Sequence, residues 1–298
     1  MSHIANKYLP IGVFDSGVGG LTVLRALRQQ LPHEHFIYLG DTARLPYGTK
    51  SADTVRSYAL NANERLVHEG IKALVVACNT ASGAALGALQ AAYPDLPIIG
   101  VIEPGVSAAL ANAHPSGPLI ILATEGTVKS QAYSQMIAPI APGREVIEWP
   151  CPLLVALAEE GWCEGELVER IIYTMLLPLL ESLQLKHPAG FLLGCTHFPV
   201  FKAAFHAVLG QDMPVIDPAT KVAEALQAVL QSRALLNEGK EPGEVRFMAT
   251  DGIDRFIRVA PRFLGGDISL QSVDLVTVAI TSVIATEVPS QRTWDQPG

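Results

Sequence analysis

Short apolar runs alternate with longer stretches of helical spacing along the chain. In the first third, such runs predict strands at residues 11–14, 36–39, 71–77 and 97–102. Leucines spaced three or four apart after the first run predict an amphipathic helix. Ser51 is a typical N-terminal cap for a further helix that ends near residue 68, with a glycine as its stop signal at residue 70. Continuous apolar strands between helices are typical of a parallel sheet.

The same order of elements returns in the second half of the chain. Apolar runs at residues 119–123, 145–149 and 191–194 predict three more strands, and the third ends at a cysteine, as it does in the first half. A long amphipathic helix is expected over residues 164–185, with a kink near Pro178. We therefore expect two related α/β units that face each other.

The chain then continues with a helix at residues 219–236, a polar break at 237–243, a strand at 245–249 and a helix at 255–264. The tail from Ser290 is polar and is expected to fray. Because the sequence contains no flexible linker, we expect short connections and one domain built from both chain ends.

Composition narrows the function classes. The length of 298 residues, with 49% hydrophobic and 17% charged, is typical of a compact protein of two domains. A net charge of −8 without a basic run disfavours nucleic acid. The N-terminus lacks a signal-peptide pattern, and the apolar segment 275–285 is too short to span a bilayer. Four cysteines without paired spacing indicate reduced thiols in the cytosol.

Two of the cysteines, Cys78 and Cys195, come directly after predicted buried strands. In open α/β sheets, ligands bind at this end of the strands. We expect each thiol to lie at the mouth of the following helix, where the pKa of a cysteine is lowered. A single cysteine in this position is more often a small core residue. Two of them, each followed by a threonine that could hold a carboxylate, favour a reaction that needs one weak base on each side of a carbon atom.

The glycine-rich segment from Asp15 to Gly20 lies between a predicted strand and helix. It is either a tight turn or an anion cradle at a helix N-terminus. Thr22 stands where the dinucleotide fingerprint requires glycine, so that fingerprint is not met, although Asp41 resembles its acidic partner. The sequence contains no G-x-x-x-x-G-K motif either.

His197 follows Cys195 by two residues and is a candidate proton partner or a capping histidine. Zinc bound by both cysteines and this histidine is an alternative that the spacing disfavours, so no metal is expected. Cys151 and Cys163 lack polar companions and are expected to be structural.

Four motifs in order resemble those of the glutamate racemase family, the cofactor-independent branch of the aspartate/glutamate racemase superfamily. They are the segments 15–21, 41–48, 78–81 and 194–199, and the resemblance runs from Ile11 to about Asp217.

The resemblance implies an α/β fold of two doubly wound domains with mainly parallel sheets, pseudo-twofold symmetry and the active site at their interface. We expect residues 1–101 with 216–298 to form the first domain and 102–215 the second. It also implies no cofactor, glutamate as the small-molecule partner, a homodimer as the candidate assembly, and a role in supplying D-glutamate for peptidoglycan synthesis.

Residue roles carry over by motif. Cys78 and Cys195 would be the two acid/base thiols, acting on the D- and L-enantiomer respectively, assisted by Asp15 on the first side and by His197 with Glu159 on the second. The substrate-binding residues implied by the resemblance are Asp15, Ser16, Tyr47, Gly48, Asn79, Thr80, Thr124, Thr127, Thr196 and His197.

Other functions stay open at this point. The same machinery could act on another acidic amino acid, notably aspartate, or the cleft could belong to a non-catalytic protein that binds an acidic metabolite. Hydantoin racemases and single-thiol decarboxylases fit less well, because both cysteines are present. A pyridoxal phosphate racemase would need a Schiff-base lysine, for which the chain offers no convincing context.

Overall fold

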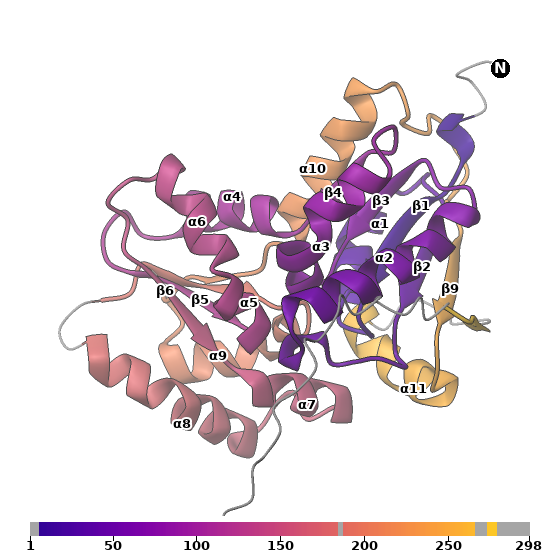
Figure 1. The fold of residues 1–298 in the computed structure, drawn as a ribbon. Helices are drawn as coiled ribbons and strands as arrows, with labels where there is room; N and C mark the ends of the chain where they lie inside the picture. The colour runs from indigo at the N-terminus through magenta and orange to yellow at the C-terminus, as the bar shows by residue number, and fades with distance from the viewer. Residues whose placement is uncertain (1–5, 184–186, 266–272, 279–298) are drawn as a thin grey trace, which may run out of the picture.

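The computed structural model describes residues 6–183, 187–265 and 273–278 (Figure 1). Within them the chain forms two sheets in which all strand pairs are parallel. The larger sheet has six strands in the order β10-β9-β2-β1-β3-β4. They are β1 Ile11–Asp15, β2 Phe36–Gly40, β3 Ala73–Val76, β4 Ile98–Gly100, β9 Val245–Ala249 and β10 Val273–Leu275. The smaller sheet has four strands in the order β6-β5-β7-β8. They are β5 Leu119–Ala123, β6 Val146–Pro150, β7 Gly190–Gly194 and β8 Val215–Ile216.

The two sheets share a topology. The order β2-β1-β3-β4 in the larger sheet matches the order β6-β5-β7-β8 in the smaller one. The strands β3 and β7, which precede Cys78 and Cys195, therefore occupy equivalent places beside the first strand of each unit. The predicted α/β fold with two related units of parallel strands is confirmed.

Helices cover both faces of each sheet. They are α1 Leu21–Gln30, α2 Ala52–His68, α3 Asn79–Ala92, α4 Ile102–Asn112, α5 Glu125–Ser130, α6 Ala132–Ile140, α7 Pro152–Glu160, α8 Glu166–Leu183, α9 Lys202–Leu209, α10 Ala219–Ser232 and α11 Ile253–Leu264. Figure 1 shows α4 and α6 on one side of the smaller sheet and α8 and α9 on the other. No helix among the described residues is both long and apolar enough to cross a membrane.

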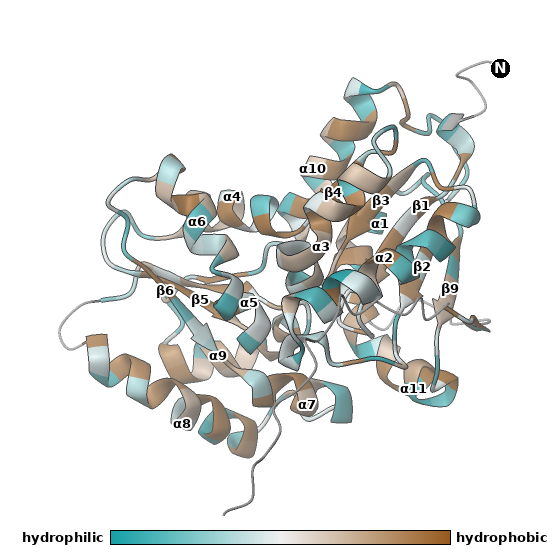
Figure 2. Cartoon of the chain, viewed as in Figure 1, coloured by the Kyte–Doolittle hydropathy of each residue, from teal (hydrophilic) through white to brown (hydrophobic). Residues whose placement is uncertain are grey.

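The inner strands β1, β2, β3, β5 and β7 are buried along their whole length, which explains their continuous apolar runs, whereas the edge strands β6 and β10 are only partly buried. Along β1, Val13 packs toward α1 and α10, whereas its neighbour Phe14 packs toward α2 and α3. Figure 2 shows the helices carrying both hydrophobic and hydrophilic residues, as expected for elements with one buried face. One apolar cluster includes Leu24 of α1 and Leu176 of α8, so the core is continuous from one unit to the other.

Most predicted elements are confirmed within a residue or two, and the differences lie at their ends. Ser51 caps α2, with its Oγ accepting from Thr54 N–H at 3.3 Å. The fourth strand was expected to reach Ile102, but it ends at Gly100 and Ile102 begins α4. The helix expected over 219–236 ends at Ser232, and Ala234 has a positive φ of 55° that no helix continues. The expected fraying of the tail from residue 290 lies outside the described residues.

Candidate active site

The carboxyl ends of the strands in both sheets meet around a narrow cavity of about 30 Å³. Eleven of the residues predicted for the site line it. They are Ser16, Tyr47, Gly48, Cys78, Asn79, Thr80, Thr124, Glu159, Cys195, Thr196 and His197. The two others, Asp15 and Thr127, lie directly behind this layer and hydrogen-bond to it. The structure thus brings the whole predicted set together from both units.

On the first side, Cys78 is the N-cap of α3, as expected. Its Sγ accepts from Ala81 N–H at 3.4 Å and hydrogen-bonds with Ser16 Oγ at 3.6 Å. Burial and the nearby charge of Asp15 nevertheless raise the pKa of Cys78 to about 12, against the lowering effect of these two hydrogen bonds. The expectation of a lowered pKa is wrong for Cys78, because desolvation of a thiolate outweighs the helix end.

Asp15 is fully buried at the end of β1. Its Oδ2 accepts from Gly17 N–H at 2.9 Å, and its Oδ1 accepts from Thr196 Oγ1 at 3.3 Å. Burial raises the pKa of Asp15, partly opposed by the charge of His197 and by backbone hydrogen bonds from Gly17 and Gly20. The glycine-rich segment is an anion cradle, but the anion in it is the chain's own Asp15 carboxylate.

The same segment needs glycine for close approach. A Cβ on Gly19 would lie 2.5 Å from Nδ1 of His197 and 2.5 Å from Oγ1 of Thr196. The first unit therefore contacts the second through a backbone that carries no side chain.

On the second side, Cys195 follows β7 and lies in a turn. Its carbonyl accepts from Phe198 N–H at 3.0 Å, and a short 3-10 helix, Phe198–Phe201, begins only there. The expectation that Cys195 lies at the mouth of an α-helix is wrong, because α9 begins at Lys202. Cys195 therefore lacks the contact with an α-helix N-terminus that Cys78 makes.

The polar neighbour of Cys195 is the side chain of His197 instead of a helix end. Its Nδ1 is 3.9 Å from Cys195 Sγ, its Nε2 is 3.1 Å from Glu159 Oε1, and its ring packs edge-on against Phe263 with centroids 5.5 Å apart. Burial alone would lower the pKa of His197, but the hydrogen bonds to Cys195 and Glu159 outweigh it and raise the pKa to about 10. This geometry favours an imidazolium that lies between Cys195 and the carboxylate of Glu159.

Three threonine hydroxyls gather where the two units touch. Thr80 Oγ1 lies 2.9 Å from Thr124 Oγ1 and 3.2 Å from Thr127 Oγ1, and the latter two are 3.1 Å apart. A group of hydroxyls that can all donate suits a carboxylate. Gly48 approaches this cluster, because a Cβ there would lie 2.6 Å from Thr124 Cβ.

Sequence reasoning missed two residues that hold this wall of the cavity. Asp41, which was noted for its likeness to a dinucleotide partner and as part of the 41–48 motif but was given no role, accepts a hydrogen bond from the Tyr47 hydroxyl. Tyr133 of α6 is fully buried and donates to Asn79 Oδ1 at 2.7 Å, which turns the amide nitrogen of Asn79 away from it. The motif around Asp41 was a usable signal, whereas nothing in the sequence links Tyr133 to a residue 54 positions earlier.

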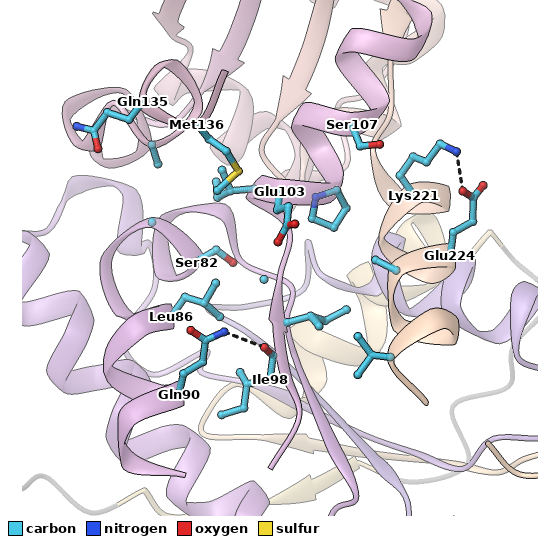
Figure 3. A pocket seen from close by; sticks show the side chains of 18 residues that line it. Ser82, Leu86, Gln90, Ile98, Glu103, Ser107, Gln135, Met136, Lys221 and Glu224 are labelled. Atoms are coloured by element: carbon cyan, nitrogen blue, oxygen red, sulfur yellow. Dashed lines mark hydrogen bonds and ion pairs between the residues drawn. The ribbon is translucent and has the colours of Figure 1, made fainter. Parts of the chain in front are cut away.

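A much larger cavity lies elsewhere, with a volume of about 780 Å³ between α3, α4, α6 and α10 (Figure 3). Its labelled polar side chains include Gln90, which donates to the carbonyl of Ile98 at 3.1 Å, and Lys221, which pairs with Glu224 at 2.6 Å. None of the predicted site residues lines it. Size alone therefore does not locate the chemistry, although the largest pocket is the usual first hypothesis.

The described residues contain no group of three or more histidine, cysteine, aspartate or glutamate side chains that could hold a metal ion.

Comparison with known proteins identifies the family of this chain. The family model for Asp/Glu/hydantoin racemases matches residues 11–226, and the chain belongs to that family. Within it, the chain is 45% identical over 256 residues to a glutamate racemase from Geobacter metallireducens, covering 86% of this chain and 93% of that one.

Two solved structures extend the likeness to the fold. Glutamate racemase from Francisella tularensis in complex with D-glutamate superimposes with a TM-score of 0.82 at 37% identity, covering 91% of this chain and 98% of that chain. The Escherichia coli glutamate racemase in complex with L-glutamate and the activator UDP-MurNAc-ala gives a TM-score of 0.73 at 28% identity, covering 91% and 99%.

Proposed function

We propose that this protein interconverts L-glutamate and D-glutamate by a two-thiol mechanism that uses no cofactor. The observation that carries the proposal is that Cys78 and Cys195, at equivalent places in two sheets of matching topology, line one cavity. Membership of the racemase family and the likeness to glutamate racemases over most of the chain support the choice of reaction and of substrate.

In the proposed reaction of L-glutamate, the Cys195 thiolate removes the α-proton, so that the Cα–H bond breaks and an S–H bond forms. The electron pair left on Cα delocalises into the α-carboxylate. The Cys78 thiol then gives its proton to the opposite face and becomes the thiolate. The reverse reaction starts with Cys78 as the base on D-glutamate.

The surroundings of each thiol determine how its thiolate is stabilised. At Cys195, the imidazolium of His197, held by Glu159, provides the opposite charge. At Cys78, burial opposes ionisation, so the thiolate needs the positive ammonium group of the substrate and the hydrogen bonds from Ala81 N–H and Ser16. In this scheme the carboxylate of Asp15 assists Cys78 by accepting the proton of its thiol when the thiolate forms.

Polar groups around the cavity hold the substrate. We assign one carboxylate to the hydroxyls of Thr80, Thr124 and Thr127 and to the amide of Asn79. The remaining contacts are assigned to Ser16, Tyr47, Gly48, Thr196 and His197. Donors fixed before the reaction stabilise negative charge that develops on the α-carboxylate when the proton leaves.

The wider setting is proposed on the same basis. Residues 1–101 with 217–298 would form the first domain and 102–216 the second. The boundary lies one residue later than expected from the sequence, because β8 pairs with β7 in the smaller sheet. We also propose a cytoplasmic location, a homodimer, and a role for the D-glutamate product in peptidoglycan synthesis.

The test is proton exchange. The protein is incubated with D- or L-glutamate in deuterated water without added cofactor, and α-deuteration is followed by NMR while optical rotation is recorded. Both enantiomers should gain deuterium as rotation falls to zero. Exchange with aspartate but not glutamate would overturn the substrate, and binding without exchange would indicate a binding protein.

A further inference from the structure

Arg255 lies in the first turn of α11, outside the residues singled out by the sequence motifs. Its guanidinium crosses to the end of α7 in the other unit, where Nη2 donates to Glu160 Oε1 at 2.9 Å and to Glu159 Oε2 at 3.3 Å. The Arg255 side chain is 49% exposed, whereas that of Glu159 is only 8% exposed. One arm of this bridge therefore reaches a buried carboxylate.

Glu159 gives its two oxygens to two different partners. Oε1 contacts His197 Nε2 at 3.1 Å, and Oε2 is the atom that Arg255 contacts. A buried carboxylate that loses a charged partner is left with an uncompensated desolvation cost and rotates toward any other donor or water. Rotation of this group would carry Oε1 away from His197.

We propose that Arg255 is a positioning residue for the Cys195 side of the site. By holding one oxygen of Glu159, it fixes the carboxylate that in turn fixes the ring of His197, with Nδ1 directed at Cys195 Sγ 3.9 Å away. Because Arg255 comes from the unit of the larger sheet and Glu159 from the other, His197 is held in this way only while the two units are in contact. The inference rests on the proposed function.

A purely structural role is the competing explanation. A cation at the C-terminal end of α7 favours the helix dipole, and half-exposed ion pairs contribute little to stability. In that case, loss of Arg255 would change thermal stability and leave the pH profile of the reaction unchanged.

A positioning role for Arg255 would instead change the pH profile of the reaction. The charged or ionisable groups that face His197 are Cys195, Glu159 and Asp15. Arg255 is bound to one of them, Glu159, whose hydrogen bond and charge raise the pKa of His197. Removing Arg255 should therefore lower the pKa of His197, because Glu159 leaves Nε2, while the ring becomes less well placed.

The experiment compares Arg255→Met and Arg255→Lys with Arg258→Met. Arg258 is an exposed arginine of the same helix for which the described part of the chain shows no ion pair, so it is a matched control. Glutamate racemisation is measured from each enantiomer between about pH 6 and 11, with thermal unfolding in parallel. For Arg255→Met we expect kcat to fall about tenfold with KM changed far less, and the basic limb to move to lower pH. Arg255→Lys should recover part of the loss, and Arg258→Met should match the wild type.

A double-mutant cycle with Glu159→Gln tests the route of the effect. If Arg255 acts through Glu159, adding Arg255→Met to Glu159→Gln should cost little more than Glu159→Gln alone. Additive losses, an unshifted basic limb, or an Arg255→Met enzyme equal to Arg258→Met would overturn the positioning role while leaving the racemase intact. A wild-type protein without racemase activity would instead overturn the proposed function, and this inference with it.

Discussion

Cys78 and Cys195 occupy matching places in two sheets of matching strand order, yet their surroundings differ. Cys78 caps α3 and faces the buried carboxylate of Asp15. The burial of Cys78 itself and the charge of Asp15 both act against a thiolate. Cys195 lies in a turn and faces His197, an imidazole whose neighbours favour its charged form. A repeated fold thus places two equivalent thiols, whereas the partners that set their proton affinities are specific to each side.

The largest effects should come from removing either thiol. Cys78→Ser and Cys195→Ser should each lower racemisation by about 10³-fold or more, because a serine hydroxyl is a far weaker base. The two variants should differ in exchange. Cys195→Ser should still exchange the α-proton of D-glutamate in deuterated water, and Cys78→Ser that of L-glutamate. Exchange of the opposite enantiomer, followed by NMR, would reverse the assignment of the two thiols.

His197→Gln should lower kcat by about 10²- to 10³-fold. The imidazolium of His197, with a pKa of about 10, is present below that pH, so wild-type activity should fall as pH rises through the pKa and this limb should vanish in the variant. Stability gives a second readout. Because the folded pKa is raised above 6.5, the contribution of His197 to stability is complete below about pH 6.5 and is lost toward pH 10. Urea unfolding at several pH values should show this slope in the wild type only.

Asp15→Asn should impair the Cys78 side of the site and lower the rate of racemisation about 10²-fold. Its effect on the thiol should have the opposite sign. The charge of Asp15 raises the pKa of Cys78, so its loss should lower that pKa and speed alkylation of Cys78 by iodoacetamide near neutral pH. Cys151 is the internal control, because burial and Cys195, not Asp15, raise its pKa to about 12. Slower alkylation of Cys78, measured by mass spectrometry of peptides, would contradict this account.

Tyr133→Phe should have the smallest effect of the four, about tenfold in kcat/KM. The change deletes only the hydroxyl that donates to Asn79, so the amide of Asn79 loses its fixed orientation while the core keeps its volume. Tyr173→Phe, at a side chain that is 49% exposed, is the matched control. Equal kinetics for the two variants would show that Asn79 needs no such support.

The fold could be predicted from the sequence mainly because its strands form recognisable apolar runs. Runs such as residues 119–123 are apolar throughout because both faces of an inner strand are buried, and that pattern is visible without a structure. The end of the fourth strand at Gly100 was less visible, because Ile102 is as apolar as a strand residue but begins a helix. Local pattern indicates that an element exists more reliably than it indicates where the element ends.

The membership of the site was predictable, but its electrostatics were not. Motif resemblance and strand-end position placed Cys78 and Cys195 together, whereas the raised pKa of Cys78 depends on how deeply Asp15 and the thiol are buried. Tyr133 and Arg255 act through contacts with residues distant in sequence, 54 and 96 positions away, and neither lies in a motif. Such partners are set by tertiary packing.

The small volume of the cavity has a consequence for successive turnovers. The cavity measures only about 30 Å³, and Cys78 and Cys195 are each only 5% exposed, so solvent has little access to the two thiols. In the proposed reaction, conversion of L-glutamate leaves Cys195 protonated and Cys78 ionised, the state that accepts D-glutamate. Until the thiols exchange protons with solvent, the enzyme would therefore stay in the form that accepts its last product. At high flux this exchange, rather than removal of the α-proton, would limit the rate.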